Sequence, residues 1–332
     1  MDAAQVLAHL DTRGLSLGQD PRVTPLTGGV SAAVHLVESG PDRWVVKQSL
    51  AELRVASEWR ATTRRALTEA AALRLAGTIT PTHVPELLDV DGAHETLVMS
   101  AAPAEALDWR SSLLSGVSDD DAVIAVAREL GRILGAWHEV TWRDPDVQGR
   151  FADYEAFEQL RLTPFHRAVQ AAHPRLVGPL SACIDDLETG RECLVHGDFS
   201  PKNVLVGPDL LWVLDFEVAH FGAATFDLAF LGHHLALKAF VGPHAPDVLA
   251  AAFAEFLASY QAELASSPRM ERLGWHLAAL MLARVDGVSP ASYVSDRHAR
   301  AIRAAATEIL SGDDASATGA WDVVRRSAEA GR

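Results

Sequence analysis

The chain has 332 residues, which is long enough for two lobes with a large buried core. Its 29 basic and 44 acidic residues give a net charge of −15, which argues against binding to nucleic acid and favours a cationic partner only weakly. Its two cysteines fit neither a disulfide framework nor a metal site. Because we find no signal peptide or membrane span, we expect a cytoplasmic protein with no membrane partner. We expect a monomer or a homodimer.

The first fifty residues show the pattern of a small antiparallel sheet. Apolar, β-rich runs between Val23 and Glu38 flank the glycine pair Gly28 and Gly29, and the strand-like run RWVVKQS follows. Glycines at a hairpin tip let backbone N–H groups approach phosphates, and Ser31 can add a hydroxyl contact, although most such pairs are simple turns. Lys47 ends a V-x-K strand, where a lysine reaches phosphates or simply faces solvent.

A helix rich in Ala, Leu, Arg and Glu is expected from about residue 55 to 75, with Gly77 ending it. The runs VPELLDVD and ETLVMS predict two more strands, which complete a five-stranded sheet. Apolar residues then recur at helical spacing over residues 120–140 and predict an amphipathic core helix, with His138 packed at its end. Residues 150–190 indicate further helices. The polar stretch after residue 311 is expected to fray, although WDVV (residues 321–324) could dock as a last short segment.

The segment LVHGDFSPKNVLVGPDLLWVLDF, residues 194–216, is the most informative part of the chain. It predicts a loop, a strand, a turn and a second strand that carry oxygen ligands. Asp198 can accept or orient the proton of an attacking hydroxyl, while Asn203 and Asp215 offer the hard oxygens that Mg²⁺ prefers. His196 is expected to brace the loop. Each acid alone could be a turn or cap residue, but their order and spacing together favour phosphoryl transfer.

The run HGDFSPKN followed by LDFEVAHFGAATFDLAF resembles the aminoglycoside phosphotransferase and choline kinase-like family of small-molecule kinases. The resemblance extends from about residue 28 to 295. It implies an α+β, bilobal protein-kinase-like fold, with a small N-terminal five-stranded antiparallel sheet plus helix and a larger, mainly helical C-terminal lobe. Relative to eukaryotic protein kinases, Gly197 replaces an Arg and Asp215-Phe216-Glu217 replaces D-F-G. Both departures indicate an acceptor that is not a protein.

The resemblance also implies two lobes. Residues 1–102 would form the nucleotide-binding lobe, and residues 103–332 would carry the catalytic loop, the metal site and the acceptor pocket. Met99 would lie beside the adenine. The backbone from Ser100 to Ala102 would form the hinge that hydrogen-bonds the adenine edge.

Two further residues receive roles from the resemblance. Glu69 lies in TEAAALRLAG, which is similar to the family's helix whose glutamate pairs with the strand lysine, here Lys47, and Glu58 is the alternative. A lysine beside phosphates needs a partner such as Glu69 to stay oriented. Asp227, in FDLAFLGHH, fits a buried hydrogen-bond acceptor that braces the catalytic loop.

Several polar residues after the metal ligand are candidates for binding the acceptor. Glu217 is expected on the same strand face as Asp215. The pair His233 and His234 could contact an anionic or hydroxylated substrate, whereas a zinc site would need a third ligand that the sequence does not supply. In LARVDGVSP, Arg284 and Asp286 are acceptor candidates beside a helix end that Gly287 could cap.

These patterns predict an ATP- and Mg²⁺-dependent kinase that moves the γ-phosphoryl group to a hydroxyl of a small molecule. The leading acceptor class is an aminoglycoside or a related aminocyclitol or sugar. A choline, ethanolamine or methylthioribose kinase is the alternative acceptor class, and GTP could replace ATP. A nucleotide-binding pseudokinase with a regulatory role is the alternative of another kind, although the full set of Lys47, Asp198, Asn203 and Asp215 disfavours it. A serine hydrolase is disfavoured because the G-x-S-x-G elbow is missing.

Overall fold

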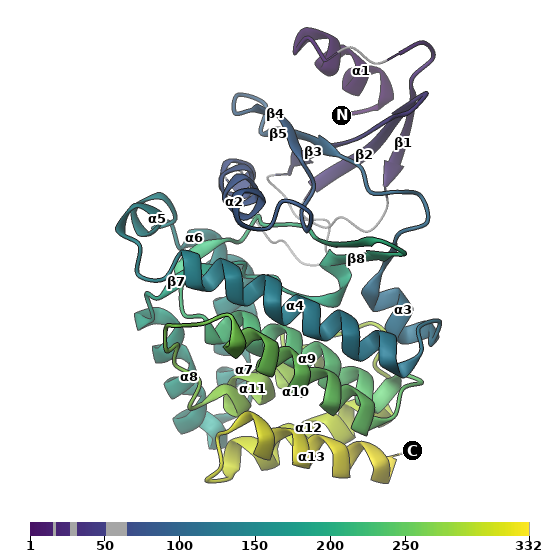
Figure 1. The fold of residues 1–332 in the computed structure, drawn as a ribbon. Helices are drawn as coiled ribbons and strands as arrows, with labels where there is room; N and C mark the ends of the chain where they lie inside the picture. The colour runs from purple at the N-terminus through teal and green to yellow at the C-terminus, as the bar shows by residue number, and fades with distance from the viewer. Residues whose placement is uncertain (16–17, 27–31, 51–64, 332) are drawn as a thin grey trace. The chain divides into compact units, whose positions relative to one another are not determined.

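The computed structural model describes residues 1–15, 18–26, 32–50 and 65–331. Gly28, Gly29, Ser31 and Glu58, to which the sequence assigned possible roles, lie outside the described residues. The chain divides into two compact units, which Figure 1 shows in ribbon form. The first unit contains Met1–Ala106 and Gly207–Val218, and the second contains Leu107–Val206 and Ala219–Arg332.

The first unit is built on a five-stranded antiparallel sheet in the order β1-β2-β3-β5-β4, as the sequence predicted. Lys47 lies opposite Leu97 in the register between β3 and β5. A further short strand, β9 (Leu210–Val213), also belongs to this unit. The sheet strands are β1 (Arg22–Leu26), β2 (Ala32–Ser39), β3 (Asp42–Ser49), β4 (Leu87–Asp91) and β5 (Thr96–Ser100).

Two helices cover the two faces of this sheet. The apolar side of α1 (Ala3–Thr12) packs in one cluster with Val98 of β5. On α2 (Arg65–Ile79), Ala70 packs in a second cluster with Leu97. Successive residues of a strand point to opposite faces, so the neighbours Leu97 and Val98 anchor one helix each.

The second unit is mainly helical, and its central helix is α9 (Thr225–Val241), which is buried along almost its whole length. Two pairs of short antiparallel strands accompany the helices: β6 pairs with β8, and β7 pairs with β10. The other helices are α3 (Trp109–Ser115), α4 (Asp120–Val140), α5 (Pro145–Arg150), α6 (Glu155–Phe157), the π-helix η1 (Glu158–Arg167), α7 (Ala168–Ala172), η2 (Pro174–Leu176), α8 (Val177–Thr189), η3 (Pro201–Asn203), α10 (Pro246–Ala262), α11 (Leu273–Asp286), α12 (Asp296–Ser311) and α13 (Ala317–Gly331). The strands are β6 (Leu107–Asp108), β7 (Cys193–Val195), β8 (Val204–Gly207) and β10 (His220–Gly222).

Helix α4 has the bounds that the apolar spacing predicted, whereas two other predicted boundaries are wrong. Helix α2 continues through Gly77 to Ile79, because one glycine inside a packed helix weakens it without breaking it. The chain after residue 311 does not fray, because α13 begins at Ala317. The docking expected of WDVV is confirmed, since α13 buries Trp321 and Val324, which recur at helical spacing. None of the described helices combines the length and apolar character needed to cross a bilayer.

The close contact between α4 and α10 gives a stability prediction. A Cβ atom on Gly131 of α4 would lie 2.2 Å from the backbone oxygen of Phe256. Gly131→Ala should therefore lower the free energy of unfolding by about 2–3 kcal/mol, despite the better helix propensity of alanine. The control Gly149→Ala, in α5, meets no atom within 4 Å and should not destabilise. Urea denaturation compares the two variants, and equal stabilities would contradict the close approach.

Candidate functional site

In the first unit, Lys47 lies between two carboxylates. Its Nζ is 2.8 Å from Glu69 Oε1, on α2, and 2.5 Å from Asp215 Oδ1. The Lys47 and Glu69 side chains are 10% and 3% exposed. The structure thus brings together the strand lysine and the helix glutamate that the resemblance implied, and adds Asp215 as a direct partner.

Electrostatics keep Lys47 charged. Burial works against its ammonium, but the carboxylates of Asp215, Glu69 and Glu217 outweigh burial and raise the pKa of Lys47. Burial also raises the pKa of the Glu69 carboxyl, against the opposing effect of Lys47. The result is a fixed, largely buried cation of the kind that binds phosphate oxygens.

Asp215 has an unusual backbone conformation. Its φ of 72° lies in the left-handed region, which costs an L-residue about 1–2 kcal/mol, and β9 has already ended at Val213. Glu217 therefore lies in a turn rather than on a strand with Asp215, and the expectation of a shared strand face is wrong. Its Oε2 accepts a hydrogen bond of 3.0 Å from Nε of the buried Arg65, so the structure pairs Glu217 with a cation that the sequence had not indicated.

The expected hinge segment is anchored to β3. The Ala101 N–H donates to the backbone oxygen of Arg43 at 3.0 Å, and the Arg43 guanidinium donates to the backbone oxygen of Ala102 at 2.6 Å. Met99, just before it, is buried in the sheet. Ser100 and Ala102 are thus held in place, and their contact with adenine stays a prediction.

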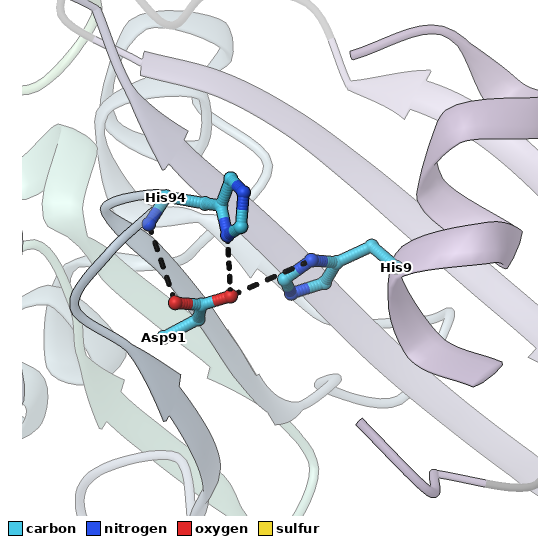
Figure 2. Close-up of side chains that lie close together, drawn as sticks. All are labelled: His9, Asp91 and His94. Carbon is cyan, nitrogen blue, oxygen red and sulfur yellow. Dashed lines mark hydrogen bonds and ion pairs between the residues drawn. The ribbon is translucent and has the colours of Figure 1, made fainter. Parts of the chain in front are cut away.

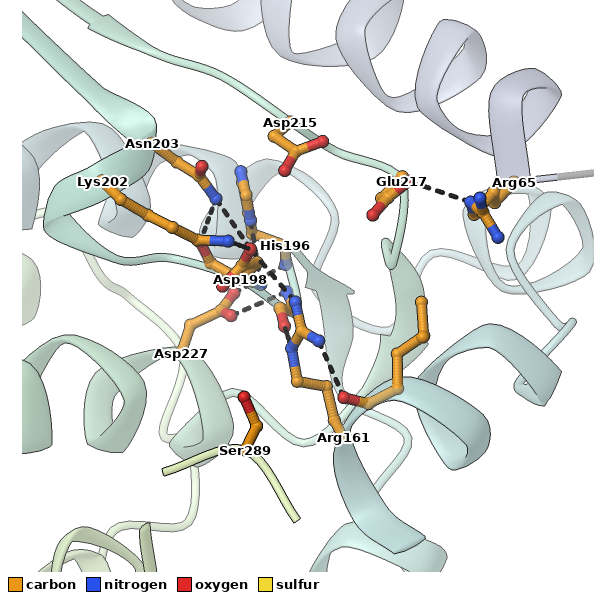
Figure 3. A network of polar contacts seen from close by, with 12 residues as sticks. Arg65, Arg161, His196, Asp198, Lys202, Asn203, Asp215, Glu217, Asp227 and Ser289 are labelled. Atoms are coloured by element: carbon orange, nitrogen blue, oxygen red, sulfur yellow. Dashed lines mark hydrogen bonds and ion pairs between the residues drawn. The ribbon is translucent and has the colours of Figure 1, made fainter. Parts of the chain in front are cut away.

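In the second unit, one buried carboxylate organises the catalytic loop (Figure 3). Asp227 Oδ2 accepts the His196 N–H at 2.7 Å, and Oδ1 accepts the Gly197 N–H at 2.9 Å. Gly197 has a φ of 78°, which a residue with a side chain adopts only with strain. His196 Nδ1 in turn accepts the Asp198 N–H at 3.1 Å. These are the contacts that bracing the loop requires of His196 and Asp227.

Three donors converge on Asp198 Oδ2 (Figure 3). They are Asn203 Nδ2 at 2.9 Å, Lys202 Nζ at 2.8 Å and Arg161 Nη2 at 3.0 Å. Lys202 lies inside the HGDFSPKN motif, whereas Arg161 comes from η1 and no sequence pattern indicated it. The carboxylate is thus fixed in direction beside two cations, which suits a group that orients a hydroxyl.

The residues expected to bind metal carry suitable donor atoms. The Asn203 amide nitrogen also donates to the Asp198 backbone oxygen at 3.0 Å, so its Oδ1 is the atom that can bind a cation. Asp215, in the first unit, supplies a carboxylate. An amide and a carboxylate oxygen are hard ligands that fit Mg²⁺. Lys47 already neutralises part of the Asp215 charge.

His233 and His234 lie in the middle of α9 rather than at its start. Both are buried, and burial lowers the pKa of each imidazole well below its usual value, so both are neutral. His233 Nε2 and His234 Nδ1 are buried and make no hydrogen bond within the described residues. The sets of three or more possible metal ligands found in the described ranges do not include this pair.

The two candidates on α11 have different surroundings. Arg284 Nη1 donates to the backbone oxygen of Ser289 at 2.6 Å, while its Nε is buried without a hydrogen bond. The Asp286 carboxylate binds Arg303 and, at 2.8 Å, His173 Nε2. Arg303 and His173 hold the pKa of Asp286 below its usual value. Asp286 therefore joins helices, and its role in acceptor binding stays a prediction.

The comparisons with known proteins agree on one family. A family model described as the phosphotransferase enzyme family matches residues 22–273. Methylthioribose kinase 1 of Oryza sativa subsp. japonica is 28% identical over 225 residues, which cover 60% of this chain and 52% of the relative. The chain thus spans about half the length of that curated relative.

Solved kinases share the fold at low sequence identity. An amicoumacin kinase aligns with a TM-score of 0.59 at 15% identity, over 96% of this chain and 96% of that chain. An aminoglycoside-3'-phosphotransferase of type VIII aligns with a TM-score of 0.54 at 20% identity, over 82% of this chain and 96% of that one. These alignments confirm the predicted kinase-like fold.

The contacts of Asp227 give a second stability prediction. Asp227→Asn keeps the size of the side chain but turns an NH₂ group toward one of the two loop N–H groups. We expect the free energy of unfolding to fall by about 2–3 kcal/mol, the typical effect of losing a buried, charge-assisted hydrogen bond. Urea denaturation measures this loss, with Asp313→Asn at an exposed loop position as the control. A loss below about 0.5 kcal/mol would show that Asp227 does not hold the loop.

Proposed function

Because the chain belongs to the phosphotransferase enzyme family, we propose that it transfers the γ-phosphoryl group of ATP to a hydroxyl of a small molecule. The catalytic loop carries this proposal. Its backbone is fixed on Asp227, and Asp198 is fixed by Asn203 and two cations. In this function Asp198 orients the acceptor hydroxyl and takes its proton as the new P–O bond forms.

Residues of both units have proposed roles toward the nucleotide. Lys47, held by Glu69, would bind phosphate oxygens of ATP. Asn203 and Asp215 would hold Mg²⁺, which neutralises phosphate charge when it is bound. The amicoumacin kinase, whose fold this chain shares, was solved with AMP-PNP and Ca²⁺, which supports a nucleoside triphosphate as donor.

A sugar or related polyol is the acceptor class that we propose. The name of the rice relative, methylthioribose kinase, supports a sugar. An aminoglycoside carries several ammonium groups, and these would meet Arg161 and Lys202 beside Asp198. Like charges close to the reacting hydroxyl oppose binding, so the local charge favours a sugar that is not a polycation.

A mass-spectrometric screen tests the activity. Purified protein with Mg·ATP is incubated with pools of neutral sugars, sugar acids, amino alcohols and aminoglycosides. We expect the mass of one phosphoryl group to be added to a sugar-type acceptor. Asp198→Asn should lower the rate by at least about 10²-fold, because the general base is lost, while ATP binding persists. Asp313→Asn is the control for a surface charge change.

Three outcomes would change this proposal. A near-normal rate in Asp198→Asn would remove Asp198 as the base. Transfer to aminoglycosides in preference to sugars would overturn the acceptor class. Nucleotide binding without transfer to any pool would favour a nucleotide-binding regulatory protein.

A further inference from the structure

Next to Asp198, the second unit contains a group of cations and neutral donors, which we call the cationic cluster. Its members come from η1, α9, α11 and the segment after α11. Two arginines and two histidines lie at the rings of Phe165 and Phe230, and a lysine lies over the ring of a tyrosine. They are Arg161, His233, His234, Lys238, Arg284 and Tyr293.

Ring contacts show that these residues form one cluster. The Arg161 guanidinium lies 5.5 Å from the ring centre of Phe230, and the His233 and His234 rings lie 4.9 and 5.4 Å from the same ring. Arg161 and Arg284 both lie over Phe165, at 5.9 and 6.0 Å. Two guanidinium groups therefore share one aromatic platform beside the catalytic carboxylate.

The cluster has an excess of positive charge. Within the described part of the chain, no carboxylate forms an ion pair with Arg284 or Lys238. Asp198 contacts the cluster, but Arg161 and Lys202 already bind it. Lys238 is 1% exposed and donates to the backbone oxygen of His234 at 3.2 Å. Burying a cation without an anionic partner is unfavourable, so an external anion would be strongly favoured here.

Unused hydrogen-bond donors point to the same ligand. Arg284 Nε and Tyr293 Oη are buried and have no hydrogen-bond partner among the described residues. His234 Nδ1 is likewise buried without a partner within the described residues and donates in the tautomer that protonates it. His233 adds no donor, because its Nδ1 already donates to the backbone oxygen of Ala229 at 3.3 Å and the Nε2 of a neutral imidazole then only accepts. Burial, together with Arg110 and Arg284, lowers the pKa of Lys238 to about 7, against the opposing effect of Asp108. An oxyanion can accept from several such donors at once, which a neutral hydroxyl cannot do equally well.

We propose that the acceptor carries an oxyanion, either a carboxylate or a phosphoryl group, which binds Arg284 and the neighbouring donors while its hydroxyl meets Asp198. The proposal rests on the kinase function and narrows its acceptor to sugar acids or sugar phosphates. Arg161 would lie between the Asp198 carboxylate and the oxyanion of the acceptor, since its guanidinium already binds Asp198 and lies near Arg284 over Phe165. The cluster thus selects the acceptor by charge.

Matched acceptors test this selectivity. Galactose, galacturonate, galactose 6-phosphate and kanamycin are compared by the rate of ADP release with Mg·ATP. We expect kcat/KM for the acid or the phosphate to exceed that for galactose by at least about 10²-fold, the scale on which a built polar site discriminates. The comparison of galacturonate with galactose 6-phosphate shows whether the site binds a carboxylate or a phosphoryl group. Equal or higher kcat/KM for galactose or kanamycin would overturn the proposal.

Arg284→Gln tests the residue itself. This variant should raise KM for the anionic acceptor by about 10²-fold and bring the anionic-to-neutral ratio close to one, because a charge-assisted hydrogen bond is lost. Tyr293→Phe, a gentler change, should lower the ratio by about tenfold. Arg303→Gln removes an arginine that binds Asp286 and should leave the ratio intact. An equal fall in kcat for neutral and anionic acceptors would assign Arg284 to the transferred phosphoryl group instead.

A binding measurement separates this proposal from the kinase function. Inorganic phosphate without nucleotide should raise the Tm of the wild-type protein and not that of Arg284→Gln. If no acceptor is phosphorylated, the kinase function fails, and the phosphate shift still decides whether the oxyanion site exists. The absence of a shift in the wild-type protein would overturn the site.

A second and independent observation lies in the first unit, where two histidines and an aspartate converge (Figure 2). Asp91 Oδ1 accepts the backbone N–H groups of Ala93 and His94 at 2.9 and 3.2 Å, which fixes the carboxylate. Its Oδ2 lies 2.8 Å from His94 Nδ1 and 3.9 Å from His9 Nδ1. The ligand atoms of these three residues all lie within 4.8 Å of one another. The His9 side chain is 10% exposed, and its Nε2 is buried without a hydrogen bond within the described residues.

We infer that His9, Asp91 and His94 bind a zinc ion, with solvent completing the coordination. Two imidazoles and one carboxylate are a common zinc donor set, and the ligand atoms of a tetrahedral site lie roughly 3.3 Å apart for bonds near 2.0 Å. The two Oδ2 distances fall on either side of that value, and all three ligand atoms lie within 4.8 Å of one another, so side-chain rotations would bring them to tetrahedral spacing. The ion would tie α1 to the turn between β4 and β5.

Zinc titration tests this site on tag-free protein dialysed against EDTA. We expect one equivalent of Zn²⁺ to compete with a chromophoric chelator and to raise the Tm, as binding to the folded state requires. His94→Ala should lower the zinc affinity by at least about tenfold, while His298→Ala, a histidine of the second unit, should leave it unchanged. Equal zinc binding by the wild-type protein and His94→Ala would identify adventitious binding only and overturn the site.

Discussion

The buried carboxylate of Asp227 is the group on which the catalytic loop depends. It is fully buried and receives two backbone N–H groups from the loop, while His138 Nε2 lies 3.4 Å from Oδ2. Its position in the first turn of α9 also places the negative charge where a helix dipole favours it. An unpaired buried charge is unfavourable. The hydrogen bonds from the two loop N–H groups to Asp227 therefore stabilise both the loop and its contact with α9. Asp198 follows directly after the two anchored residues and therefore has little freedom.

Opposite charges organise the first unit in a related way. Lys47 is surrounded by carboxylates, and the Arg65–Glu217 pair joins α2 to the segment 207–218, which is far away in sequence. Asp215 lies between these pairs in a strained backbone conformation. Such strain persists where the surroundings fix the residue from several sides, and it is common at functional positions.

The charge of the whole chain and the charge close to Asp198 have opposite signs. The net charge of −15 belongs to the chain as a whole, where it promotes solubility and says little about a buried site. Around Asp198, by contrast, Arg161 and Lys202 are in direct contact, and Arg284 lies on the same aromatic platform as Arg161. In the acceptor selection that we propose, these few cations would outweigh distant acidic groups because they act at short range and low dielectric.

Features that depend on local order could be predicted from the amino-acid sequence. The five strands, α4 and the residues of the HGDFSPKN loop follow from alternation, helical periodicity and fixed spacing, which act within a short stretch of chain. Contacts between side chains that are distant in sequence depend on how the helices pack and could not be predicted in this way. Arg161 reaches Asp198, and Arg284 reaches the ring of Phe165, because helices pack around α9, and side-chain periodicity does not specify the partner of a buried cation. The same packing buries His233 and His234 and pairs Asp286 with Arg303. The sequence marked all three residues as candidates for binding the acceptor, but their environments in the fold differ.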